Sequence, residues 1–154
     1  MLLVVSGVIA HSANSVQSFD RSGFYAALAS ESLDSVNAVL ETLSKSSLSN
    51  KEAFEGTLLM KKAGLVPNMG SKWGLFKTGR NKLENAITKE NNNAELRFLR
   101  LMIQENIPGI LGYKKHLEED NKLIHSSFKS LPPAVQKVVA EYSKKSKVLK
   151  PALS

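Results

Sequence analysis

The spacing of apolar residues is the feature that most constrains the fold of this chain. Between residues 33 and 45, the apolar side chains of Leu33, Val36, Leu40 and Leu43 recur every three or four residues. Because an α-helix has 3.6 residues per turn, this spacing places all four on one helical face. No stretch beyond residue 16 shows the alternation that is typical of a β-strand. The pattern therefore predicts an all-α protein.

Seven segments share this periodicity, and residues that cap or break helices separate them. Asn50 and Asn93 are typical N-caps, and Pro133 suits a first helical turn. We expect helices over Arg21–Ser30, Leu33–Lys45, Lys51–Ala63, Lys72–Lys89, Ala94–Asn106, Lys114–Lys129 and Ala134–Lys145. Short links make consecutive helices antiparallel, so the sequence predicts six to seven helices in hairpins, as a bundle or a helical stack.

Two details concern the third and fourth predicted helices. Gly56 lies inside the third helix, where it costs about 1 kcal/mol relative to alanine. A glycine at such a position indicates that a neighbouring helix passes close by. Residues 66–70 read as a turn-rich linker, after which Ser71 is expected to cap the fourth helix.

The chain has 154 residues, which suits one domain, and we assign residues 16–154 to it. A domain of this size buries enough surface to form a core without disulfides or metals. Cysteine is absent, which excludes disulfides, thiol nucleophiles and cysteine-based metal sites.

The N-terminal run Leu2–Ala10 is apolar and too short to span a membrane. It fits the apolar part of a secretory signal, with possible cleavage before Ala13 or Val16, so residues 1–15 are predicted to be a signal-peptide remnant. No lysine or arginine precedes the run, although a signal normally has a positive start. The alternatives are a start further upstream, or a first element packed into a cytoplasmic domain. We expect an exported protein, periplasmic or secreted.

Several runs resemble two known helical families. Gly79–Ile87 resembles the second helix of a tetratricopeptide repeat, and Asn93–Arg100 resembles the helix that opens after its turn. The runs Leu59–Gly64, Arg97–Leu101 and Ser146–Leu149 are similar to a family of small exported bacterial α-helical proteins, over most of residues 19–150. These resemblances imply a stack of helical hairpins and export, and they name no reaction.

The sequence contains little that indicates catalysis. Residues 64–72 have glycines, a serine and a lysine, but not in the order of a phosphate-binding loop, and no strand precedes them. His116 and Asp120 share a helical face, with Glu119 beside them, and such a pair can begin a metal site. The alternative is a surface histidine with a helix-stabilising carboxylate. We expect no cofactor and no metal, and keep a metal-dependent hydrolase as the least favoured function.

The strongest candidate binding residues lie on the predicted helix 94–106. Arg97, Arg100 and Gln104 share one face of this strongly apolar helix, with Glu105 next to them. Arginines on a central helix either pair with buried carboxylates, such as Glu55 or Glu84, or line a groove. The favoured function is a non-enzymatic domain that binds a protein or peptide near Arg97 and Arg100.

The net charge of +7 is concentrated at the C-terminus. Lys144, Lys145, Lys147 and Lys150 form a basic tail, for which a solvated, frayed end is the simplest interpretation. The alternative function is binding of a polyanion or a membrane surface through this tail. Nucleic acid is not expected as a partner, because the chain is predicted to be exported and the tail has few aromatic residues.

Overall fold

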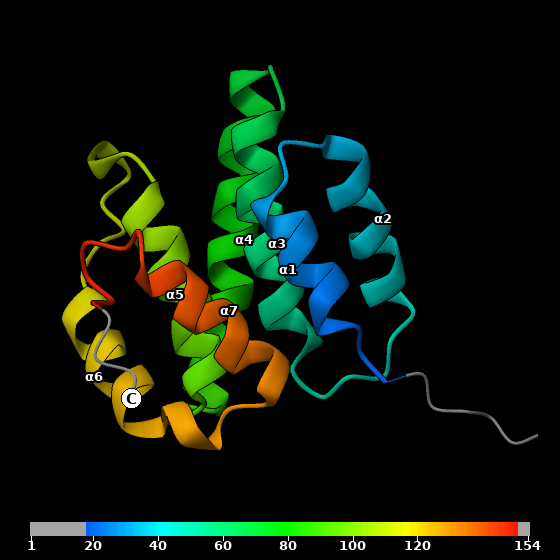
Figure 1. The fold of residues 1–154 in the computed structure, drawn as a ribbon. Coiled ribbons are helices and arrows are strands. Elements are labelled where there is room, and N and C mark those ends of the chain that lie inside the picture. The colour runs from blue at the N-terminus through cyan, green and yellow to red at the C-terminus, as the bar shows by residue number, and fades with distance from the viewer. Residues whose placement is uncertain (1–17, 151–154) are drawn as a thin grey trace, which may run out of the picture.

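A computed structural model describes residues 18–150. These residues form seven α-helices and two short 3-10 helices with no strand, which confirms the all-α prediction (Figure 1). The helices are α1 (Arg21–Ala29), α2 (Leu33–Ser44), α3 (Lys51–Leu65), α4 (Met69–Lys89), α5 (Ala94–Asn106), α6 (Leu117–Ser127) and α7 (Pro133–Ser143), and the 3-10 helices are η1 (Gly109–Leu111) and η2 (Phe128–Ser130). The predicted signal segment and its cleavage positions lie outside the described residues.

Helices α3 and α4 form the central hairpin of the bundle. Figure 1 shows α1 and α2 on one side of this hairpin and α5 and α6 on the other. Helix α7, the last helix of the described residues, contacts α1, the first. Their common core is aliphatic apart from a few aromatic rings, of which Phe24, Phe54 and Phe98 are fully buried. No helix in residues 18–150 is long and apolar enough to cross a membrane.

Two glycines set the close approach of α3 and α4. A Cβ atom added to Gly56 would lie 2.5 Å from the carbonyl oxygen of Gly79, and one added to Gly79 would lie 2.5 Å from that of Gly56. The two backbones therefore touch at this point, where only glycine fits on either helix. This confirms the prediction that a helix passes close to Gly56.

Two helix starts differ by three residues from those predicted, and α7 begins one residue early, at Pro133. Helix α4 begins at Met69, three residues early, because the side chain of Asn68 accepts a hydrogen bond from the Ser71 backbone N–H and so acts as the cap in place of Ser71. Helix α6 begins at Leu117, three residues late. The chain turns before it at Gly112, which has a left-handed backbone (φ 62°) that glycine adopts readily.

Helix α1 is tied to α5 by a buried carboxylate. Glu95 accepts hydrogen bonds from the Arg21 guanidinium at 3.0 Å and from the Tyr25 hydroxyl at 3.2 Å. Burial and the nearby Glu95 charge raise the pKa of Tyr25, so this hydroxyl keeps its proton as a donor. The contact holds α1 beside the first turn of α5, and the C-terminal half of α1 forms one wall of the groove described below.

Candidate functional site

The candidate arginines on α5 lie in a buried cluster of charges. Asp120 on α6 is fully buried, and its carboxylate accepts hydrogen bonds from Arg97 at 2.8 Å and from Arg100 at 2.7 Å, the latter through two guanidinium nitrogens. Arg97 also bonds Glu119 and the backbone and side chain of Asn91. Bidentate pairing of this kind is the strongest hydrogen bonding that arginine makes with a carboxylate.

The cluster extends to α4 through Glu84. Arg100 donates to this carboxylate at 2.9 Å, and the hydroxyl of the buried Tyr113 donates to its other oxygen. Burial and the Glu84 contact both raise the pKa of Tyr113, so the hydroxyl stays protonated. Burial alone would lower the pKa of Arg100, but Asp120 and Glu84 outweigh it and raise that pKa. The cluster thus joins α4, α5 and α6 through the ion pairs of the two arginines.

These contacts answer the alternative left open for the two arginines. Both pair with carboxylates, and Glu84 is one of the two partners that the sequence suggested, whereas Glu55 pairs with Lys82 at 2.9 Å. Gln104 is fully buried as well, and its side-chain oxygen accepts the backbone N–H of His116 at 3.4 Å. None of Arg97, Arg100 and Gln104 lines the groove described below.

The possible metal pair is part of the same cluster. Asp120 is bound by the two arginines, and His116 makes a 3.3 Å contact with Glu119 at the surface. Hydrogen bonds from Arg97 and, with a smaller effect, from His116 lower the pKa of Glu119. Within residues 18–150, no group of three or more acidic or histidine side chains is placed to hold a metal ion.

The backbone that carries the basic C-terminal residues contacts α5 through Glu105. Glu105 accepts hydrogen bonds from the Ser146 hydroxyl at 2.7 Å and from the Lys147 backbone N–H at 2.6 Å. Burial opposes ionisation of Glu105, but these hydrogen bonds outweigh it and lower its pKa. Beyond this contact, Leu149 is fully buried. The chain after α7 therefore packs on the domain, and the side chains of its lysines project from a fixed backbone.

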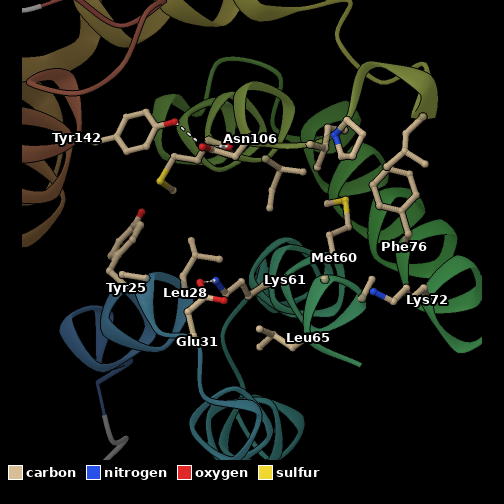
Figure 2. A pocket seen from close by; sticks show the side chains of 18 of the residues that line it. Tyr25, Leu28, Glu31, Met60, Lys61, Leu65, Lys72, Phe76, Asn106 and Tyr142 are labelled. Atoms are coloured by element: carbon tan, nitrogen blue, oxygen red, sulfur yellow. Dashed lines mark hydrogen bonds and ion pairs between the residues drawn. The ribbon is translucent and has the colours of Figure 1, made fainter. Parts of the chain in front are cut away.

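A groove of about 1100 Å³ opens at the end of the bundle where α1, α3, α5 and α7 finish and α4 begins (Figure 2). Segments from the whole length of the domain contribute to its walls, including η1. Its apolar lining includes Leu28, Met60, Phe76, Met102, Ile103 and Val138. Most of its surface is therefore hydrophobic, as in sites that bind apolar ligands.

The groove also holds the exposed apolar side chains of the domain. Across residues 18–150, the large hydrophobic residues that are exposed are Met69 (75%), Trp73 (57%) and Ile110 (94%). All three lie on the groove, Met69 and Trp73 on the first turns of α4 and Ile110 on η1. Exposing such side chains to water is unfavourable, and their concentration in one place makes the groove the candidate binding surface of the described residues.

The charged residues at the groove are unevenly neutralised. Lys61 pairs with Glu31 at 2.8 Å, and Glu141 pairs at 2.7 Å with Lys144 outside the groove. Lys72 and Lys145 have no carboxylate within 4.0 Å in the part of the chain that the structure describes. The groove is thus apolar inside and cationic at its margin.

The sequence did not predict this groove. Met69 lay in a stretch that was assigned to a linker, so its i, i+4 relation to Trp73 on α4 was not visible. With the helix start corrected, two large apolar residues on an otherwise polar first turn would have been the signal.

Comparison with protein-family models, curated proteins and solved structures gives no match to this chain.

Proposed function

We propose that this protein is a non-enzymatic binding module that holds an apolar segment of another protein in the groove. The observation that carries the proposal is the gathering of Met69, Trp73 and Ile110 on one groove, when other large apolar side chains in residues 18–150 are at least partly buried. Covering this surface would remove apolar area from water, which is the main driving force of protein association.

The size of the groove supports a segment of a macromolecule as its occupant. Pockets for drug-sized molecules enclose roughly 300–1000 Å³. This groove has about 1100 Å³ and is open to solvent along one side. An open apolar groove between helices is a form that binds side chains projecting from a partner chain.

We further propose that the binding takes place outside the cytoplasm, and this part rests on the signal-like run Leu2–Ala10 alone. N-terminal sequencing of the protein from its own host tests it. A mature start at Ala13 or Val16 supports export, and a retained Met1 contradicts it.

A glycine on the groove wall allows a direct test of binding. Gly64 lies in the last turn of α3, and a Cβ added there would meet no atom within 4 Å. Gly64→Phe therefore adds a large side chain at the groove wall, at a position where its Cβ atom meets no neighbour. Gly74→Phe is the matched control, because Gly74 is also helical, exposed and open but does not line the groove.

The probe is a 16-residue synthetic peptide with leucines on one helical face and glutamine and alanine elsewhere. Trp73, the single tryptophan of the chain, is half exposed at the groove and reports occupancy by a shift of its emission to shorter wavelength. We expect saturable binding to the wild type and to Gly74→Phe, and binding at least about tenfold weaker to Gly64→Phe. Equal binding to the two variants, or no binding to the wild type, would contradict the proposed function.

A further inference from the structure

We infer that the natural occupant of the groove is an amphipathic α-helix that carries carboxylates at both ends of its apolar face. This inference rests on the proposed function and adds the conformation and the charge of the partner. Its basis is the state of the polar groups on the groove wall and the position of its unpaired lysines.

The tyrosine hydroxyls and the asparagine side-chain nitrogen of the groove wall already donate hydrogen bonds within the protein. The Tyr25 hydroxyl donates to Glu95 at 3.2 Å. Asn106 donates from its side-chain nitrogen to the Met102 carbonyl and to the Tyr142 hydroxyl, both at 2.8 Å. The Tyr142 hydroxyl in turn donates to Glu105 at 2.9 Å. These three side chains therefore have no free donor for the backbone carbonyls of a bound chain.

An extended segment would therefore lose the hydrogen bonds of the backbone groups that face the groove. Extended peptides usually bind by adding a strand to the edge of a sheet, and residues 18–150 contain no strand. An α-helix bonds its own backbone internally and presents only side chains, at positions i, i+3, i+4 and i+7. The groove thus fits a helix better than an extended chain.

The margin of the groove selects for negative charge. Two lysines that line it, Lys72 and Lys145, lack a carboxylate partner in the described part of the chain, whereas Lys61 is neutralised by Glu31 and Glu141 by Lys144. Lys145 lies over the ring of Tyr142, 5.5 Å from its centre. In Figure 2, Tyr142 and Lys72 lie at opposite ends of the groove. The two unpaired cations are therefore separated along its length, and a helix with acidic residues at both ends meets both.

Three other occupants fit this charge pattern less well. Residues 1–17 contain no aspartate or glutamate, so this chain's own apolar segment would leave both lysines unpaired. A second copy of the chain brings a net charge of +7 toward the same surface. An acyl chain with an anionic head group carries its charge at one end only and would meet one lysine.

The experiment compares two versions of the leucine-faced peptide, one with two glutamates in its first and last turns and one with lysines at the same positions. The full-length protein is titrated at low salt. The test variant is Lys72→Glu/Lys145→Glu. The matched control is Lys77→Glu/Lys147→Glu, which makes the same change in net charge at two exposed lysines that do not line the groove.

We expect the wild type and the control to bind the glutamate peptide about tenfold more tightly than the lysine peptide, and the test variant to reverse this order. Circular dichroism of the bound peptide is expected to show helix. Equal binding of both peptides by the wild type would overturn the charge assignment and leave the proposed function standing. If the wild type bound none of the glutamate, lysine and neutral peptides, both the charge assignment and the proposed function would be overturned. Palmitate that binds the wild type more tightly than the glutamate peptide would overturn the helix in favour of an acyl chain.

Discussion

Replacing Gly56 by alanine tests whether the contact between α3 and α4 limits the packing of the whole bundle. The new Cβ would lie 2.5 Å from the carbonyl oxygen of Gly79 and 2.9 Å from the backbone nitrogen of Leu83. Ordinary contact begins near 3.4 Å, so the two helices must separate by about 0.9 Å at this point. Because both neighbouring atoms belong to the backbone, no flexible side chain can absorb the shift.

Two opposing terms set the size of the effect. Forcing extra atoms into a packed core costs about 1–3 kcal/mol, and the upper end applies where backbone must move. Alanine returns about 1 kcal/mol through its better helix propensity. The free energy of unfolding of Gly56→Ala should therefore fall by about 2 kcal/mol, which lowers the melting temperature by roughly 4–8 °C in a domain of this size.

The assay is urea unfolding followed by circular dichroism, with Gly74→Ala as the control. Gly74 is helical and exposed, and a Cβ there meets no atom within 4 Å, so this variant should gain about 1 kcal/mol. The two alanine variants should thus differ by about 3 kcal/mol in opposite directions from the wild type. A Gly56→Ala protein as stable as Gly74→Ala would refute the argument that these backbones are in contact.

Two further predictions concern carboxylates, the first at Asp120 and Glu119 on α6 and the second at Glu105 on α5. Asp120→Ala leaves two buried guanidinium groups without their shared carboxylate and should lower the free energy of unfolding by about 3–5 kcal/mol, whereas Glu119→Ala, at a mostly exposed carboxylate, should change it by less than about 1 kcal/mol. Equal losses of unfolding free energy for the two variants, measured by chemical denaturation, would contradict the argument that burial strengthens the effect of removing Asp120. Hydrogen bonds lower the pKa of Glu105 below its ordinary value of 4.5, so its contribution to stability is complete above the pKa of the unfolded chain and is lost as the pH falls through the lower folded value. The Lys147 backbone N–H donates to Glu105 at 2.6 Å, so its protection factor in hydrogen exchange should fall over this acid range in the wild type and be low at all pH values in Glu105→Ala. A protected Lys147 amide in that variant would contradict the role of the carboxylate.

The helices could be predicted from the sequence because local spacing and capping decide them. Helix α5 has the predicted bounds, and the side chain of Asn93 caps it through the backbone N–H groups of Glu95 and Leu96. The wrong start of α4 occurred where the choice lay between two neighbouring caps, Asn68 and Ser71, and that of α6 where the chain turns at Gly112. Such alternatives differ by about 1 kcal/mol or less, and the sequence pattern does not resolve that difference.

The sequence predicted that buried arginines would pair with carboxylates, but it did not identify all of those carboxylates. The apolar surroundings of Arg97 and Arg100 required carboxylates, because a buried charge without a partner is strongly unfavourable. Glu84 was among the expected partners, but the sequence assigned Asp120 to a possible metal pair with His116. Only the packing of α6 on α5 brings Asp120 to the arginines, 20 and 23 positions away along the chain.

The sequence by itself thus determined the helical class, most helix bounds and the close passage at Gly56, since these follow from interactions within a few residues or from the requirement for a small side chain. The tertiary structure decided the groove. Its walls come from five helices and η1, and its exposed side chains lie on two segments, at Met69, Trp73 and Ile110. A groove of this kind forms where packed helices leave space between them. The spacing of apolar residues within one helix does not indicate where that space will be.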